Sequence, residues 1–129
     1  MIRVVDVETS WQVTENGGYD PSPFHPDNIL VSVGIDDEYF FTNHSEKIDK
    51  GCFHKIQELL DTTTLLVGHN IKFDLMWLLE SGFKYEGRVY DTMIGEYILN
   101  KGIRKSLTLE MCCRRRKIGS KDNRIKDFT

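Results

Sequence analysis

The chain has 129 residues, 40% of them hydrophobic, and a formal net charge of −3, which predicts one domain over residues 1–129 with a single core. It holds no run of about 18 apolar residues, so we expect no membrane span. Arg3 and Asp6 interrupt the first apolar stretch, which argues against a secretory signal. Three cysteines without metal-site spacing indicate a reducing, cytoplasmic setting.

The first part of the chain predicts strands. Residues 2–7 read as a buried strand, and residues 29–35 and 38–42 as two more, joined by a tight turn at Asp36-Asp37. Residues 11–28 contain a glycine pair and three prolines, so we expect an irregular connection there. Three antiparallel strands therefore open the fold.

The second part alternates helices with strands. Apolar spacing predicts a helix over 50–61, a buried strand over 63–67, and a helix over 73–81 that ends at Gly82. A short extended segment (89–90), a helix over 93–100 capped by Asp91-Thr92, a helix from Ser106 to 116 and a loose tail (119–129) follow. This order predicts an α/β fold with a mixed sheet flanked by helices.

Two carboxylates stand two residues apart in the first strand. Residues i and i+2 of a strand face the same side, so Asp6 and Glu8 are expected to point together. Surface acid pairs are common, but both acids lie within an apolar run, where an unpaired buried charge is costly. Like charges this close repel, and a divalent cation held by oxygens relieves the repulsion.

A second polar group follows the 63–67 strand. Asn70 comes at the strand end, and the next helix carries Asp74 toward the edge of the sheet where α/β folds place their sites. We expect the Asn70 side chain to cap this helix or to bond a strand-end backbone group. Phe73 either stacks on a nucleotide base or is a core aromatic under the helix.

These acids suit phosphodiester hydrolysis with two Mg²⁺ or Mn²⁺ ions. In that chemistry Asp6 is the bridging ligand, Glu8 binds the ion that activates water, and Asp74 completes the shell of the other ion. The sequence therefore predicts three catalytic, metal-binding acids.

Three strings carry a family resemblance: residues 4–9 (VVDVET), 68–75 (GHNIKFDL) and 90–99 (YDTMIGEYIL). They resemble the proofreading 3′→5′ exonuclease domain of family A DNA polymerases, in the ribonuclease-H-like DEDD superfamily. The resemblance implies that Asp6, Glu8 and Asp74 bind metal. It also implies that the 3′ end of single-stranded DNA is the substrate and that a polymerase domain is a partner.

By the same resemblance, Thr9, Asn70 and Phe73 contact the 3′-terminal nucleotide. The family also wedges an apolar side chain against the last bases. Trp11 is the nearest large apolar residue, with a loop-anchoring or core role as its alternative. An RNA-trimming relative within the superfamily is a further alternative.

The third family motif, a Tyr or His followed four residues later by an acid, has no match here. No Tyr or His is followed by Asp at that spacing, and His54 with Glu58 lies on an earlier helix. The chain thus resembles a C-terminally truncated domain. Three explanations are open. A second polypeptide from a split gene supplies the remainder, the chain is a piece of a larger polymerase, or it is an exonuclease-like module that binds without cutting. A phage replication system is a natural source.

The charge is unevenly distributed. Residues 1–83 carry 5 Lys/Arg and 14 Asp/Glu, whereas residues 84–129 carry 12 and 6, with four consecutive basic residues at 114–117. This segment can follow the phosphates of a single strand, meet an acidic partner surface, or form a solvated helix end. Four consecutive residues cannot share one helical face, which favours the solvated helix end.

Overall fold

The computed structural model describes residues 1–42, 48–101 and 105–117, which fall into two compact units, Met1–Asp91 and Thr92–Thr129. Within these ranges no helix combines the length and apolar character needed to cross a membrane. The elements are β1 (Ile2–Thr9), β2 (Gln12–Val13), β3 (Tyr19–Asp20), β4 (Leu30–Ile35), β5 (Glu38–Phe41), α1 (Lys50–Asp61), β6 (Leu65–Gly68), α2 (Ile71–Glu80), β7 (Arg88–Asp91), α3 (Thr92–Leu99) and α4 (Leu109–Arg116).

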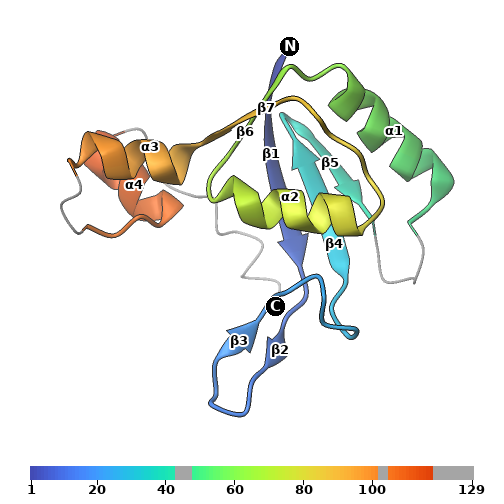
Figure 1. The fold of residues 1–129 in the computed structure, drawn as a ribbon, viewed down its shortest axis with the longest axis horizontal. Coiled ribbons are helices and arrows are strands. Elements are labelled where there is room, and N and C mark those ends of the chain that lie inside the picture. The colour runs from blue at the N-terminus through green and yellow to red at the C-terminus, as the bar shows by residue number, and fades with distance from the viewer. Residues whose placement is uncertain (43–47, 102–104, 118–129) are drawn as a thin grey trace. The chain divides into compact units, whose positions relative to one another are not determined.

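Five strands of the first unit form one mixed sheet in the order β5-β4-β1-β6-β7 (Figure 1). β4 is antiparallel to β1 and β5 to β4, while β6 is parallel to β1 and β7 to β6. The sheet confirms the predicted α/β class. Its parallel part brings the carboxyl ends of β1, β6 and β7 to the same edge.

Both helices of the first unit pack on one face of this sheet. β1 contributes Val5 and Val7 to that face. One apolar cluster joins them to β4, β6, α1 and α2: Val33, Ile35, Leu66, Ile56, Leu60, Ile71, Trp77 and Leu78. Both connections between the parallel strands thus return across the same side of the sheet.

The opposite face carries large exposed side chains. Ile2 and Val4 of β1 are exposed there, and Tyr39 and Phe41 of β5 are 72% and 73% exposed. The prediction that residues 2–7 form a fully buried strand is therefore wrong, because β1 buries only alternate residues.

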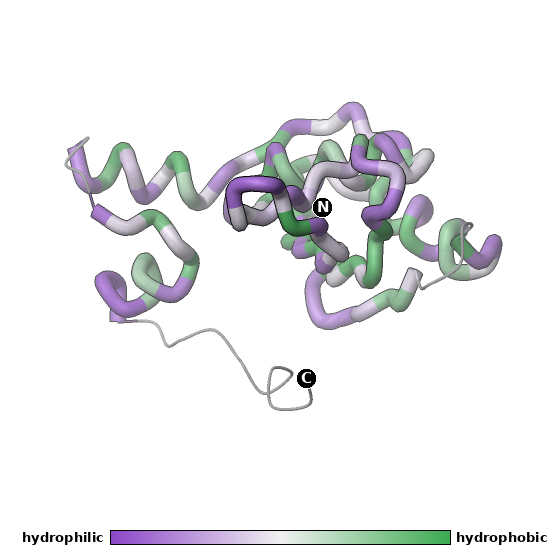
Figure 2. The backbone as a smooth tube through the Cα atoms, turned by 90° about the horizontal axis from the view of Figure 1, so that it is seen from below, coloured by the Kyte–Doolittle hydropathy of each residue, from purple (hydrophilic) through white to green (hydrophobic). Residues whose placement is uncertain are grey.

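α1 has the predicted bounds. The Asp49 side chain accepts hydrogen bonds from the backbone N–H groups of Gly51 and Cys52, at 3.1 and 3.2 Å, and so caps its first turn. Hydrophilic and hydrophobic residues alternate along α1 in Figure 2, as expected for an amphipathic helix.

The segment over 11–28 is more ordered than predicted. β2 and β3 pair as a short antiparallel hairpin, closed by a turn in which Gly17 adopts φ 79°. The Asn28 amide donates to the carbonyls of Asp20 and Ser22, and the Trp77 indole donates to the carbonyl of Pro21 at 2.9 Å. These side-chain bonds fix the segment without long strands.

Several boundaries differ from those predicted. β6 begins at Leu65, two residues after the predicted start at 63. α2 begins at Ile71, two residues before the predicted start at 73. Gly82 adopts φ 98° just after α2, as expected of a helix-ending glycine. α4 is capped by Thr108 rather than by Ser106. The predicted loose tail, 119–129, lies outside the described residues.

Candidate functional site

Asp6 and Glu8 lie on one side of β1, as the strand period predicts, and both are exposed. The predicted placement of both acids within the strand is confirmed, but the burial of their charges, which supported the site from sequence, is wrong: Val5 and Val7 are the buried residues. The acids escape the cost of burial because the pleat turns them to the exposed face.

Asp74 is the buried member of the acidic group, at 4% exposure in the first turn of α2. Its carboxylate forms a hydrogen bond with the backbone of Val7, the residue between Asp6 and Glu8. Burial and then the charge of Asp6 raise the pKa of Asp74 to about 7. The Val7 hydrogen bond lowers it, and the charges of Asp91 and Glu8 raise it further. The structure thus brings Asp74 into electrostatic contact with both acids of β1.

Gly68, the last residue of β6, leaves room for the Asp74 carboxylate. A Cβ atom added at Gly68 would lie 3.2 Å from Asp74 Oδ2 and 3.2 Å from Ile71 Cγ1. Gly68 is itself buried, so neither neighbour has free space into which to move. The absent side chain at this position is therefore part of the geometry that seats Asp74.

Asn70 occupies the N-cap position of α2 in a left-handed conformation (φ 58°, ψ 54°), and its side chain makes no capping hydrogen bond. The cap comes instead from Asp91, whose Oδ1 accepts from the N–H of Asn70 at 2.9 Å and whose Oδ2 accepts from the N–H of Ile71 at 3.2 Å. The predicted capping by Asn70 is wrong.

From the sequence, Asp91 was expected to cap the following helix. The structure makes it the last residue of β7, paired with Gly68, and turns its carboxylate toward α2. A signal was present: Asp91 ends a strand, and parallel strands end at one edge of the sheet, beside the turn at Asn70.

The three remaining predicted substrate contacts lie in different surroundings. Thr9 is half-buried at the end of β1, where the pairing with β4 shifts register. Phe73 is half-buried against the apolar core, in agreement with its core alternative. Trp11 is 53% exposed and packs edge-on against Tyr19, with ring centroids 4.4 Å apart.

The acidic group suits a hard divalent ion, because its donors are all carboxylate oxygens and the negative charges of its members repel the charged form of Asp74. Among the described residues, however, no three His, Cys, Asp or Glu side chains are arranged to hold a metal ion. Asp6, Glu8 and Asp74 therefore have the right donor type without a closed coordination shell.

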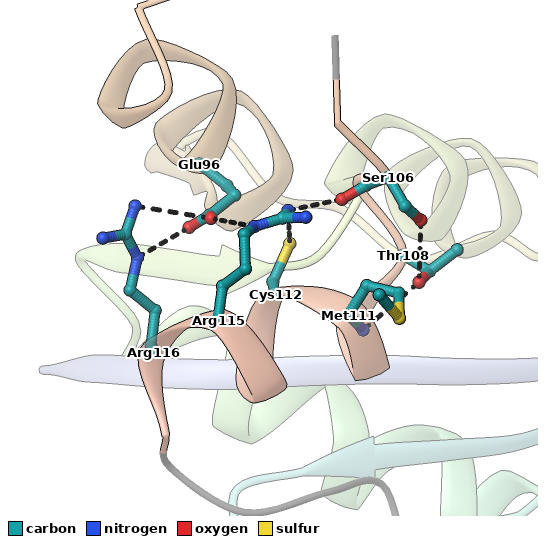
Figure 3. A network of polar contacts seen from close by, with 7 residues as sticks. All are labelled: Glu96, Ser106, Thr108, Met111, Cys112, Arg115 and Arg116. Carbon is teal, nitrogen blue, oxygen red and sulfur yellow. Dashed lines mark hydrogen bonds and ion pairs between the residues drawn. The ribbon is translucent and has the colours of Figure 1, made fainter. Parts of the chain in front are cut away.

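The basic segment of the second unit is largely paired (Figure 3). The buried carboxylate of Glu96, on α3, accepts from Arg115 at 3.0 Å and from Arg116 at 3.1 Å. Arg115 also donates to the Ser106 carbonyl, and Arg114 pairs with Glu110 at 3.0 Å. The role of Glu96 was not predicted from the sequence. These pairings leave less free positive charge than the run 114–117 suggests.

A protein-family model described as 3′-5′ exonuclease matches residues 14–114. The matched segment includes Asn70, Asp74 and Asp91 and begins after β1, which carries Asp6 and Glu8. No curated protein matches the sequence.

Proposed function

Since the chain belongs to the 3′-5′ exonuclease family, as its resemblance to the polymerase proofreading domain predicted, we propose that it is a metal-dependent nuclease that shortens single-stranded DNA from the 3′ end. One observation supports this proposal beyond the family: the buried Asp74 carboxylate bonds to the backbone of Val7, between Asp6 and Glu8, and the charges of both acids raise its pKa.

In this proposal Asp6, Glu8 and Asp74 are the catalytic residues and would hold Mg²⁺ or Mn²⁺. The bound ions would supply charge stabilisation and a nucleophilic water at neutral pH. Thr9 and Asn70 would hold the terminal nucleotide at the edge of the sheet. Trp11, which is exposed, would contact one of the last bases by stacking, whereas Phe73 would support the site from the core.

We further propose that full activity needs a fourth acidic group from a further segment or a partner chain, with a polymerase domain as the natural context. The sequence supports this, because no Tyr or His is followed by Asp four residues later. We therefore expect slow hydrolysis by the 129-residue chain.

The test is digestion of a 5′-labelled single-stranded oligonucleotide in Mg²⁺ or Mn²⁺. The variants Asp6→Asn and Asp74→Asn each remove one acid. Glu80→Gln is the matched control, because Glu80 is an exposed acid at the far end of α2. Stepwise shortening that both site variants abolish and the control retains supports the proposal. Shortening that survives both variants contradicts it.

A second candidate function is a module that binds single-stranded nucleic acid, or a polymerase, without cutting. It is favoured by the open arrangement of the acids, which forms no metal-holding group among the described residues. Retained binding of the labelled strand without shortening, at any metal concentration, would favour this candidate. A parallel assay with RNA of the same sequence determines the sugar preference.

A further inference from the structure

Asp91 lies beside the junction at which β6 becomes α2. It is the last residue of β7, and its register partner across the parallel pair is Gly68, the last residue of β6. Only His69 and Asn70 separate Gly68 from the first residue of α2. A side chain at the end of β7 can therefore reach a turn twenty residues earlier in the sequence.

The Asp91 carboxylate uses both oxygens on this turn. One accepts the N–H of Asn70 and the other the N–H of Ile71. Successive N–H groups in a turn with a left-handed residue form a concave anion site, and Asp91 fills it. Asn70 is a residue type that adopts this conformation comparatively readily, and its own amide takes no part in the cap.

We propose that Asp91 is a positioning residue for the acidic site: by holding the left-handed turn at Asn70 and the first turn of α2, it keeps the Asn70 amide directed away from the cap and Asp74 beside Val7. The role in ligand binding rests on the proposed function, whereas the role in seating Asp74 does not. Each of the two N–H groups belongs to a residue directly linked to the site: Asn70 itself and Ile71, whose side chain adjoins Gly68.

The alternative is a purely structural role, in which Asp91 only caps α2 and stabilises it by about 1 kcal/mol. The chain contains a matched control for this alternative. Asp49 caps α1 through two backbone N–H groups at 3.1 and 3.2 Å, but it is local to its own helix and contacts neither Asn70 nor Asp74. Asp49→Ala and Asp91→Ala therefore each remove a carboxylate that accepts two backbone N–H groups, but only Asp91 also places a negative charge near Asp74. Asp91→Asn removes the same charge as Asp91→Ala, so the comparison of these two variants separates the cap from the charge.

The experiment compares Asp91→Ala, Asp91→Asn and Asp49→Ala in the full chain. Amide hydrogen exchange and chemical shifts are followed at Val7, Asn70 and Ile71. We expect Asp91→Ala to accelerate exchange at Asn70 and Ile71 and to shift the Val7 amide signal. Asp91→Asn keeps one acceptor oxygen and should give an intermediate result. Asp49→Ala should change none of the three signals.

The second readout is Mn²⁺ binding, measured by water proton relaxation with the metal alone. Partners that orient metal ligands typically contribute about 10–100-fold in affinity, so we expect Asp91→Ala to weaken Mn²⁺ binding about tenfold and Asp49→Ala to leave it unchanged. Equal behaviour of the two alanine variants in both readouts overturns the inference. If the wild-type chain binds no Mn²⁺, the proposed function fails, and the amide signals still decide the positioning role.

Discussion

The carboxylate of Asp74, on α2, bonds to the backbone of Val7, the residue of β1 that separates Asp6 from Glu8. This hydrogen bond joins a helix that begins after β6 to the central strand of the sheet. It also fixes the one buried acid of the group beside two exposed ones. The packing of α2 on β1 therefore holds the carboxyl group of Asp74 beside the charges of Asp6 and Glu8.

The first prediction concerns pH. The folded protein holds a proton on Asp74 up to about pH 7, whereas the unfolded chain loses it near the ordinary value of 3.8. Between these values the folded state binds more protons, so the stabilisation from this group is lost as pH rises. Replacing Asp74 by Asn removes this dependence, because the amide does not titrate.

At about 1.4 kcal/mol per pKa unit, Asp74→Asn should gain roughly 2–3 kcal/mol in unfolding free energy relative to wild type between pH 5 and pH 8. Urea unfolding at both pH values measures it, with Glu80→Gln as the control. Parallel pH curves for wild type and Asp74→Asn would contradict the prediction.

The second prediction concerns the space at Gly68. Gly68→Ala places a methyl group 3.2 Å from Asp74 Oδ2 and should displace the carboxylate, with a loss of about 1–3 kcal/mol in stability and of any metal-dependent hydrolysis. Gly51→Ala is the matched control, because its Cβ would also lie 3.2 Å from a carboxylate oxygen, that of the N-cap residue Asp49, but at an exposed position in the first turn of α1. Unfolding curves and oligonucleotide digestion measure both effects. Unchanged digestion by Gly68→Ala would contradict the prediction.

A third prediction follows from the paired arginines. Glu96→Gln removes the negative charge shared by Arg115 and Arg116, so single-stranded DNA should bind more tightly, with a steeper dependence on salt concentration. Fluorescence anisotropy over a salt series measures this. Glu110→Gln frees only the exposed Arg114 and should have a smaller effect. If both variants give the wild-type salt slope, these arginines do not contact phosphates.

The same carboxylate predicts an acid limit for the second unit. The hydrogen bond from Arg115 is the main cause that holds the pKa of Glu96 below 4.5, and Arg116 contributes. The stabilisation is complete above pH 4.5 and is lost as pH falls through the lower, folded-state pKa. The protection factors of the α4 amides, which correct for the slower intrinsic exchange at low pH, should therefore fall on acidification, and in Glu96→Gln this fall should be much weaker. Identical acid profiles would contradict the assignment.

The fifth prediction tests the exposed Trp11. Trp11→Ala should weaken single-strand binding by about 1–3 kcal/mol, the usual value for one stacked base. The lost edge-on contact with Tyr19 should lower stability by at most about 0.5–1.5 kcal/mol. Phe24→Ala removes another exposed aromatic residue of the same segment and serves as the control. Quenching of Trp11 fluorescence by the oligonucleotide is a second readout, since the other tryptophan, Trp77, is buried. Equal affinities of both variants and wild type would exclude stacking on Trp11.

Local patterns predicted much of the fold. The helix over 50–61 has the predicted bounds, because the signals that define it are local: apolar residues recur at helical spacing along it, and its N-cap residue directly precedes it. The α/β class followed from the same kind of signal. Asp6 and Glu8 were placed on one side of a strand correctly, since the pleat alone decides it.

Long-range partners could not be predicted in this way. Asp91 was assigned to the helix next to it in sequence, but its carboxylate binds a turn twenty residues earlier, across a strand pair. Glu96 was missed for the same reason, because its partners are 19 and 20 residues away. Capping and pairing rules read from sequence identify residue types and local spacing; the partner is chosen by the packing of the sheet.

The one-sided packing of the first unit has a practical consequence. Ile2, Val4, Tyr39 and Phe41 expose a hydrophobic surface on the sheet face opposite α1 and α2. Dyes that fluoresce on such surfaces are ordinarily used to detect loosened, partly folded states. Here the native protein itself should bind them, so a dye-monitored melt should begin from a bright baseline, whereas circular dichroism reports the loss of structure directly.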